Sequence, residues 1–312
     1  MHGLQLSRGY FENVARPKLE SSFPQLYPRL AAGLAGNGSE CYGYDDEISR
    51  DHDWGIDFYI WVTESDKEFI PALKNWKNTL FKDAPPEFTR NRSEYGAQID
   101  VMTCGDFYAG LIGAPEGPKT LNDWIRVPEE NFAMAVNGEV FIDGTREFSK
   151  TREYLLSYYP EDLRRKRISA KCMALAQTGQ YNHERTAIRE DWVTLRTVLS
   201  RFNDAAISMA FLLSKVYKPY YKIAYRALGG LGGVGRETAR LLLNIAEDGA
   251  LDHAAQTRRQ AHITQLCSFF ASHLNAQGLS DSGDWFLASH GESVKNCIKD
   301  EFLRSLPAQY EI

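Results

Sequence analysis

The chain has 312 residues, 43% of them hydrophobic and 12% aromatic, which is enough for about two domains with packed cores. This composition excludes a wholly disordered chain. The formal net charge of −5 argues against a protein that coats nucleic acid non-specifically, although a local basic groove is compatible with it.

The cysteines and the apolar segments indicate the cellular compartment in which the protein functions. The five cysteines are widely spaced, and neither a C-x-x-C motif nor a Cys/His spacing typical of zinc occurs, so they predict reduced thiols. Residues 1–10 hold no apolar signal-peptide segment, and the apolar stretch 205–216 is too short to span a bilayer. We therefore expect a soluble, cytoplasmic protein without a membrane partner.

The first half of the chain mixes predicted strands with a helix. Residues 56–62 alternate between two faces, which is typical of a strand, and residues 97–103 have the same character. Between them, apolar residues recur at helical spacing over 69–80. Residues 30–36 form a small apolar run that suits a buried strand or a helix equally well. This order of elements predicts a mixed α/β layer.

The second half of the chain is predicted to be all helical. Apolar stripes at helical spacing run through it, for example at Ile263, Leu266, Phe270 and Leu274. We place a domain boundary near 150–160. The prediction is an α+β protein, with a mixed α/β sheet domain at 1–150 and a helical domain at 151–312 that closes a nucleotide and acceptor cleft.

One constellation of residues points to chemistry. A Gly38-Ser39 turn follows the apolar run 30–36 and offers backbone N–H groups and a hydroxyl to an anion. About a dozen residues later, Asp51 and Asp53 have the i, i+2 spacing that places two carboxylates on one face of an extended chain. Asp100 adds a third acid within a predicted strand. Such carboxylates could hold a hard divalent cation shared with substrate phosphates.

In this order the residues resemble the polymerase-beta-type nucleotidyltransferase superfamily, which has a Gly-Ser turn, an Asp-x-Asp strand and a third carboxylate on a later strand. One departure is Trp54-Gly55, which separates the aspartate pair from the apolar strand and would re-aim the pair if Gly55 formed a bulge. The sequence is more closely similar to the branch called domain of unknown function 4037. That similarity lies in residues 33–40, 43–55, 137–141 and 181–185.

The resemblance implies a nucleotidyltransferase-type fold and a metal-dependent reaction. Asp51, Asp53 and Asp100 would be the catalytic and metal-binding residues, with Mg²⁺ or Mn²⁺ as the cofactor, and Asp100 would complete a second metal site or accept a proton. Gly38 and Ser39 would hold the β- and γ-phosphates of an NTP, for which ATP is the first expectation. An acceptor hydroxyl would attack the α-phosphate, and pyrophosphate would leave.

Additional nucleotide contacts are expected from the second half of the chain. Lys215, Lys218 and Lys222 would share one face of a helix and could bind the triphosphate, unless Pro219 interrupts that helix. A solvated cationic face is an equally good interpretation. Tyr217 could stack on a base, although half-buried packing is the commoner role of such a tyrosine.

Four other features are interpreted as structural. The basic run 164–167 is expected to be a solvated helix face rather than an RNA contact, and the acidic loop 45–47 is expected to face solvent, where it could attract a cationic acceptor. The string 230–235 fits G-x-G-x-x-G, but a helical segment precedes it, so a flexible connection is favoured over a dinucleotide site. His183 has no assigned catalytic role.

The leading hypothesis is transfer of an NMP group from an NTP to an acceptor hydroxyl. The acceptor is unknown and could be a small molecule such as an amino sugar, a protein or an RNA. Two alternatives are a non-catalytic nucleotide-binding regulatory module and a protein that grips RNA through residues 164–167. The net charge disfavours the last of these, so nucleic acid is a possible partner but not the favoured one.

Overall fold

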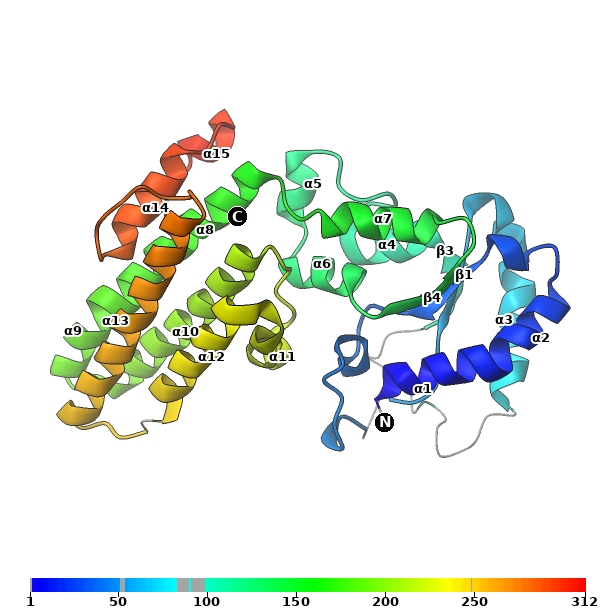
Figure 1. Ribbon diagram of the computed structural model, residues 1–312, viewed down its shortest axis with the longest axis horizontal. Coiled ribbons are helices and arrows are strands. Elements are labelled where there is room, and N and C mark those ends of the chain that lie inside the picture. Colours follow the sequence, from blue (N-terminus) through cyan, green and yellow to red (C-terminus); the bar gives the residue numbers. More distant parts are fainter. Residues whose placement is uncertain (1, 51–53, 83–89, 91–98, 248) are drawn as a thin grey trace. The chain divides into compact units, whose positions relative to one another are not determined.

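The computed structural model describes residues 2–50, 54–82, 90, 99–247 and 249–312. It divides into two compact units, Met1–Tyr158 and Tyr159–Ile312. The first is an α+β unit with one small mixed sheet, and the second is helical wherever it has regular structure (Figure 1). The coarse α+β prediction is confirmed.

Four strands form the sheet of the first unit, in the order β3-β2-β1-β4. Strand β1 pairs antiparallel with β2 and with β4, whereas β2 and β3 are parallel. The run 30–36, which suited a strand or a helix, contains β1. The strands are β1 (Ala31–Leu34), β2 (Tyr59–Val62), β3 (Val101–Thr103) and β4 (Glu139–Asp143).

Strand β2 begins later than its alternating sequence suggests. Gly55 has a φ of 137°, a conformation that favours glycine, and regular pairing starts only at Tyr59. The predicted alternation of faces is nevertheless confirmed. Phe58, Ile60 and Val62 belong to one buried apolar cluster, while the other face of the strand carries Trp61.

Helices cover both faces of the sheet because β2 is apolar on both sides. On the first face, Phe11 and Leu73 pack into the same cluster as Phe58. On the second face, the Trp61 ring stacks on Phe148 with centroids 3.8 Å apart. The helices of this unit are α1 (Gly3–Tyr10), the π-helical segment η1 (Phe11–Ala15), α2 (Arg16–Ser22), α3 (Ile70–Lys82), α4 (Cys104–Ile112), α5 (Leu121–Arg126), α6 (Glu129–Val136) and α7 (Glu147–Leu156).

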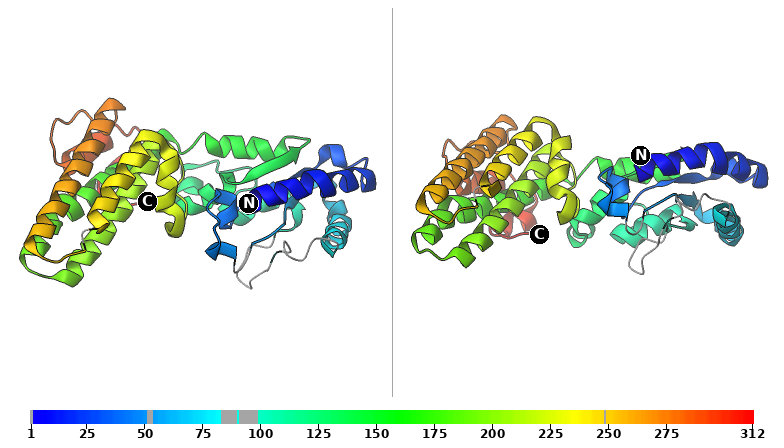
Figure 2. Two further views of the ribbon diagram at one scale, coloured as in Figure 1. Left: turned by 60° about the horizontal axis from the view of Figure 1, so that its bottom comes forward. Right: turned by 90° about the horizontal axis from the view of Figure 1, so that it is seen from below.

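The second unit packs its long helices side by side around an apolar core (Figure 2). Ile263, Leu266, Phe270 and Leu274 are fully buried along one helix, as their spacing predicts. The helices of this unit are α8 (Glu161–Leu175), the π-helical segment η7 (Ala176–Asn182), α9 (His183–Ile188), α10 (Trp192–Ser214), α11 (Tyr221–Ala227), α12 (Gly232–Glu247), α13 (His253–Ala276), α14 (Leu287–Asn296) and α15 (Glu301–Ser305).

The glycine-rich string 230–235 is not a flexible connection. It spans the end of a 3-10 turn, Leu228–Leu231, and the start of α12. A Cβ on Gly235 would lie 1.9 Å from the carbonyl oxygen of Leu228, so close backbone packing accounts for this glycine. A helix precedes the string, which agrees with the rejection of a dinucleotide site.

The five cysteines are free, as expected, and only Cys297 is exposed. Within the part of the chain that the structure describes, we find no helix with both the length and the apolar character needed to cross a membrane.

Candidate functional site

The predicted phosphate-binding turn leaves β1 as a tight loop. Gly36 and Gly38 have φ values of 97° and 125°, which side chains rarely tolerate, and Ser39 then opens a 3-10 turn, Ser39–Tyr42. Within the described residues, the N–H groups of Gly38 and Ser39 have no intramolecular acceptor. The loop therefore offers backbone donors of the kind that bind anions.

Residues next to β4 hold this loop in place. The side chain of Asn137 accepts a hydrogen bond from the Gly36 N–H and donates one to the Gly36 carbonyl oxygen, both at 2.7 Å. The N–H of Gly138 donates to the Cys41 carbonyl at 2.8 Å. Arg152 in turn donates to the carbonyls of Asn137 and Gly138. Rigid support of this kind is what a phosphate-binding loop requires.

A buried ion pair lies beneath the turn. Glu40 is 1% exposed and Arg90 8%, and the guanidinium Nη1 lies 2.8 Å from Oε1 of Glu40. Burial raises the pKa of Glu40 and outweighs the opposing effect of Arg90. A Cβ on Gly38 would lie 2.9 Å from Oε2 of Glu40, so the carboxylate fills the space that a side chain at 38 would need.

The acidic loop 45–47 does not face solvent as a whole, contrary to expectation. The Asp45 side chain is fully buried and accepts hydrogen bonds from the Gly3 N–H at 2.8 Å and from Nε1 of Trp54 at 2.9 Å. It also lies 2.9 Å from Nδ1 of His2. Asp45 thus holds the start of α1, where a carboxylate suits the helix dipole, and is not available to attract an acceptor.

Asp100 directly precedes β3 and remains partly exposed. Its Oδ2 lies 2.6 Å from Nζ of Lys74 on α3, and its Oδ1 accepts a hydrogen bond from the Val101 N–H at 2.8 Å. Burial alone would raise the pKa of Asp100, but the hydrogen bonds from Lys74 and Val101 hold the pKa below its ordinary value. Asp100 is therefore a preformed anion.

Tyr59 connects Asp100 with the loop after β1. Burial raises the pKa of Tyr59, and the thiol of Cys41 and the carboxylates of Asp57 and Asp100 raise it further. Strand register places Asp100 and the loop after β1 at one edge of the sheet, because Gly33 of β1 pairs with Tyr59 and the Ile60 N–H donates to the Asp100 carbonyl at 3.3 Å.

Asp57 is a site feature that the sequence did not single out. It is 1% exposed and its Oδ1 lies 2.8 Å from Nζ of Lys77, which is also buried. The alternating pattern of 56–62 placed Asp57 with aromatic residues on one strand face. An acid among aromatic residues on a strand face, followed by a lysine on the next predicted helix, is the sequence pattern from which this buried ion pair could have been predicted.

Asp51 and Asp53 lie outside the described residues. No group of three potential metal-ligating side chains occurs within the described ranges. Asp100 fits part of the donor set, because an ionised carboxylate is a hard oxygen ligand and each of its oxygens has a second lone pair.

The lysines predicted to share a helical face do not do so. Helix α10 ends at Ser214, where Lys215 takes a left-handed conformation, and residues 216–220 are not helical. Nζ of Lys215 lies 3.5 Å from Glu161, while Lys218 contacts Asp204 at 2.8 Å and Ser208 at 2.7 Å. Lys222 is exposed on α11. Their role in nucleotide binding stays a prediction.

Tyr217 is buried within the helical unit. It is 4% exposed, and its ring packs edge-on against Tyr159 with centroids 4.9 Å apart. The structural interpretation of this tyrosine is therefore better supported than stacking on a base, which would need an accessible ring face.

The basic run 164–167 is not a solvated face. Arg164 is 2% exposed and donates to the Leu212 carbonyl and to Gln277, and Lys166 is fully buried. The Arg167 guanidinium lies 4.3 Å from the centre of the Tyr159 ring. Arg164 and Lys166 are therefore not accessible to phosphates, whereas Arg165 and Arg167 are partly exposed, and RNA binding through the run stays an untested alternative. His183 is also buried, with Nδ1 2.7 Å from Gln260.

Comparison with known proteins gives one match. The family described as "Domain of unknown function (DUF4037)" matches residues 124–223. No curated protein and no solved structure matches the chain. The matched segment includes Asn137, Gly138 and Arg152, which support the loop, but not the loop itself or the three predicted carboxylates. This match over residues 124–223 agrees with the resemblance to domain of unknown function 4037 that the sequence indicates at 137–141 and 181–185.

Proposed function

We propose that this protein is a metal-dependent nucleotidyltransferase that moves an NMP group from an NTP to an acceptor hydroxyl and releases pyrophosphate. The observation that carries the proposal is the edge of the sheet at Tyr59, where strand register puts Asp100 beside β2 and the loop of Gly38 and Ser39 directly after β1. An anion-binding loop beside a cation-binding carboxylate is the arrangement that phosphoryl chemistry needs.

Each described residue has a defined part in the proposed reaction. The N–H groups of Gly38 and Ser39 and the Ser39 hydroxyl bind the β- and γ-phosphates, while Asn137 keeps the loop in shape. Asp100, with Asp51 and Asp53, would hold Mg²⁺, which supplies charge neutralisation at the phosphates. Because its pKa is lowered, Asp100 is a better cation ligand than proton acceptor, which favours the first of its two predicted roles.

The second candidate is a non-catalytic nucleotide-binding module. The ion pair between Asp100 and Lys74 favours it, because a lysine 2.6 Å from the carboxylate competes with a metal ion for the same oxygen. In that case nucleotide would bind equally well with and without Mg²⁺, and no pyrophosphate would be released.

The deciding experiment uses α-labelled ATP, GTP, CTP and UTP with Mg²⁺ or Mn²⁺ and a cell extract as the source of acceptor. Pyrophosphate release is followed in parallel. The variants are Asp53→Asn and Asp100→Asn, with Asp106→Asn on α4 as an exposed carboxylate control.

We expect the wild type and the control to transfer label. The transfer rate of Asp53→Asn and of Asp100→Asn should fall about a hundredfold or more. Full activity in both variants would refute the assigned metal ligands. Mg²⁺-independent nucleotide binding without transfer would support the binding module instead.

A further inference from the structure

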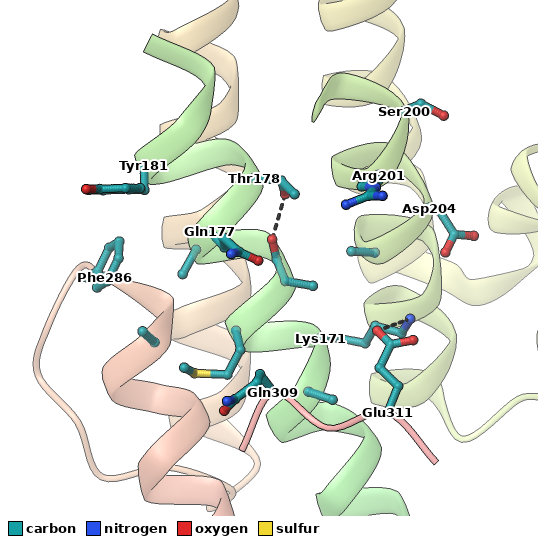
Figure 3. A pocket seen from close by; sticks show the side chains of 16 residues that line it. Lys171, Gln177, Thr178, Tyr181, Ser200, Arg201, Asp204, Phe286, Gln309 and Glu311 are labelled. Atoms are coloured by element: carbon teal, nitrogen blue, oxygen red, sulfur yellow. Dashed lines mark hydrogen bonds and ion pairs between the residues drawn. The ribbon is translucent and has the colours of Figure 1, made fainter. Parts of the chain in front are cut away.

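A cavity lies wholly within the helical unit. Its volume is about 790 Å³, and it is walled by α8, η7, α10, the start of α14 and residues 309–311 near the end of the chain (Figure 3). This volume is in the range of pockets that bind small molecules. None of the residues assigned to the proposed nucleotidyltransferase reaction in the first unit takes part in it.

One wall of the cavity is a π-helical segment, η7. Gln177, Thr178 and Tyr181 on this segment line the cavity, and the Thr178 hydroxyl donates to the Ala174 carbonyl at 2.6 Å, one turn earlier. Helices of this type are less stable than α-helices and occur often at functional sites. The distorted turn therefore marks the wall on which a ligand is expected.

The cavity has an aromatic end. The side chains of Tyr181 and Phe286 lie one above the other at the same side of the cavity in Figure 3. Tyr181 is 51% exposed, and the Arg185 guanidinium lies 4.7 Å from its ring centre. Neighbouring Trp285 is 61% exposed. Exposed aromatic rings beside a cavity suit a ligand with a planar apolar ring system.

The opposite side of the cavity is charged, and its charges are unequal. Lys171 is paired with Glu311 at 2.8 Å, and Asp204 is paired with Lys218 at 2.8 Å. Arg201 lines the same side in Figure 3 and makes no ion pair or hydrogen bond within the described residues. The Arg201 guanidinium is thus available to bind an anion, and its planar arrangement of N–H donors is suited to a carboxylate or phosphate.

We propose that this cavity binds a small planar anion, with an aromatic ring system between Tyr181 and Phe286 and one carboxylate or phosphate group on Arg201. The amide side chains of Gln177 and Gln309, which also line the cavity, offer hydrogen bonds to polar atoms of the ring. The two anionic groups share the chemistry that Arg201 recognises, so the test includes both.

The test is isothermal titration calorimetry of the full chain with 2-naphthoate, 2-naphthyl phosphate and the uncharged 2-naphthol. The wild type should bind one equivalent of at least one anion more tightly than 2-naphthol. Arg201→Gln should weaken anion binding about tenfold and leave 2-naphthol binding nearly unchanged. Tyr181→Ser should weaken binding of all three probes. Arg236→Gln, an exposed arginine on α12, is the matched control and should behave as wild type.

Preference for 2-naphthoate would indicate a carboxylate ligand, and preference for 2-naphthyl phosphate a phosphate ester. Absence of binding of all three probes to the wild type at millimolar concentrations would overturn the proposal. Anion binding that is unchanged in Arg201→Gln would overturn it as well, because the probe would then occupy another site. Neither result bears on nucleotide transfer, which is measured separately.

Discussion

Nζ of Lys77 lies 2.8 Å from Oδ1 of Asp57, and both side chains are almost completely shielded from water. The same ammonium donates to the Ile99 carbonyl at 2.9 Å, and the carboxylate accepts from the Phe58 N–H at 2.8 Å. This pair joins α3 to the residues that lead into β2 and β3. The pair therefore holds the segments before β2 and β3 next to each other, at the edge of the sheet where Asp100 lies.

Removing one partner of this pair should be strongly destabilising. In Lys77→Met the charge of Asp57 is left buried without its partner, which should lower the free energy of unfolding by about 3–5 kcal/mol. The double variant Asp57→Asn/Lys77→Met should lose less, because no buried charge remains. Urea unfolding measures both. Lys67→Met, which breaks an exposed pair with Glu64, should change the free energy of unfolding far less. An equal loss in Lys67→Met and Lys77→Met would refute the importance of the buried pair.

The turn after β1 should not tolerate a side chain at Gly38. Gly38→Ala combines an unfavourable φ with a contact to the Glu40 carboxylate, so we expect a loss of about 1–3 kcal/mol in stability and of most nucleotide binding. Gly43→Ala is the matched control, because Gly43 also has a positive φ, 70°, but no atom lies within 4 Å of where its Cβ would be. Thermal unfolding and nucleotide titration compare the two. Equal losses of stability and of nucleotide binding in the two variants would show that the contact with the Glu40 carboxylate does not contribute to the effect of Gly38→Ala.

Asp100 should show an acid-dependent contribution to stability. Its pKa in the folded state lies below the ordinary value of 3.8, so its contribution is complete above about pH 4 and is lost as the pH falls through the folded-state pKa. In Lys74→Met burial should dominate and raise the pKa of Asp100. An NMR titration of the Asp100 carboxyl carbon measures the shift, with Lys82→Met at the end of α3 as the control. An unchanged pKa in Lys74→Met would rule out the ion pair as the cause.

Lys166 should titrate at an unusually low pH. Burial, together with the charge of Lys295, lowers the pKa of Lys166 to about 8. Between about pH 8 and the ordinary value of 10.5, the unfolded chain binds a proton that the folded protein has released, so this group makes stability rise with pH. The Cε resonance of Lys166 should therefore shift with a midpoint near pH 8. A midpoint above pH 10 would show that the carbonyls around the ammonium outweigh burial.

Elements of the fold were predictable where burial leaves a periodic signal. The alternation in β2 and the helical spacing in α3 and α13 follow from apolar contacts that each segment makes along its own length. The start of β2 was harder to predict, because the alternating pattern begins at residue 56 whereas regular pairing starts only at Tyr59. The Gly38–Ser39 loop and Asp100 could be proposed from the sequence, since their residue types and order carry the chemistry.

Charged residues were the main source of error, because their environment depends on distant partners. Arg164 appeared solvated in a run of basic residues, yet Gln277, 113 residues away, accepts its hydrogen bond. Asp45 appeared exposed, yet it holds the start of α1. The spacing of Lys215 and Lys218 suggested one helical face, but the chain leaves the helix after Ser214. No local pattern contains these partners.

Lys166 also links residues 307–310 to the cavity of the helical unit. Its ammonium donates to the carbonyls of Pro307, Ala308 and Tyr310, which ties residues 307–310 to α8. Residues 309–311 then form a wall of the cavity in the helical unit. Tyr310 lies between Gln309 and Glu311, which line the cavity, and is 55% exposed, so a dye attached at position 310 in Tyr310→Cys would sit beside the cavity and should report on whether it is occupied.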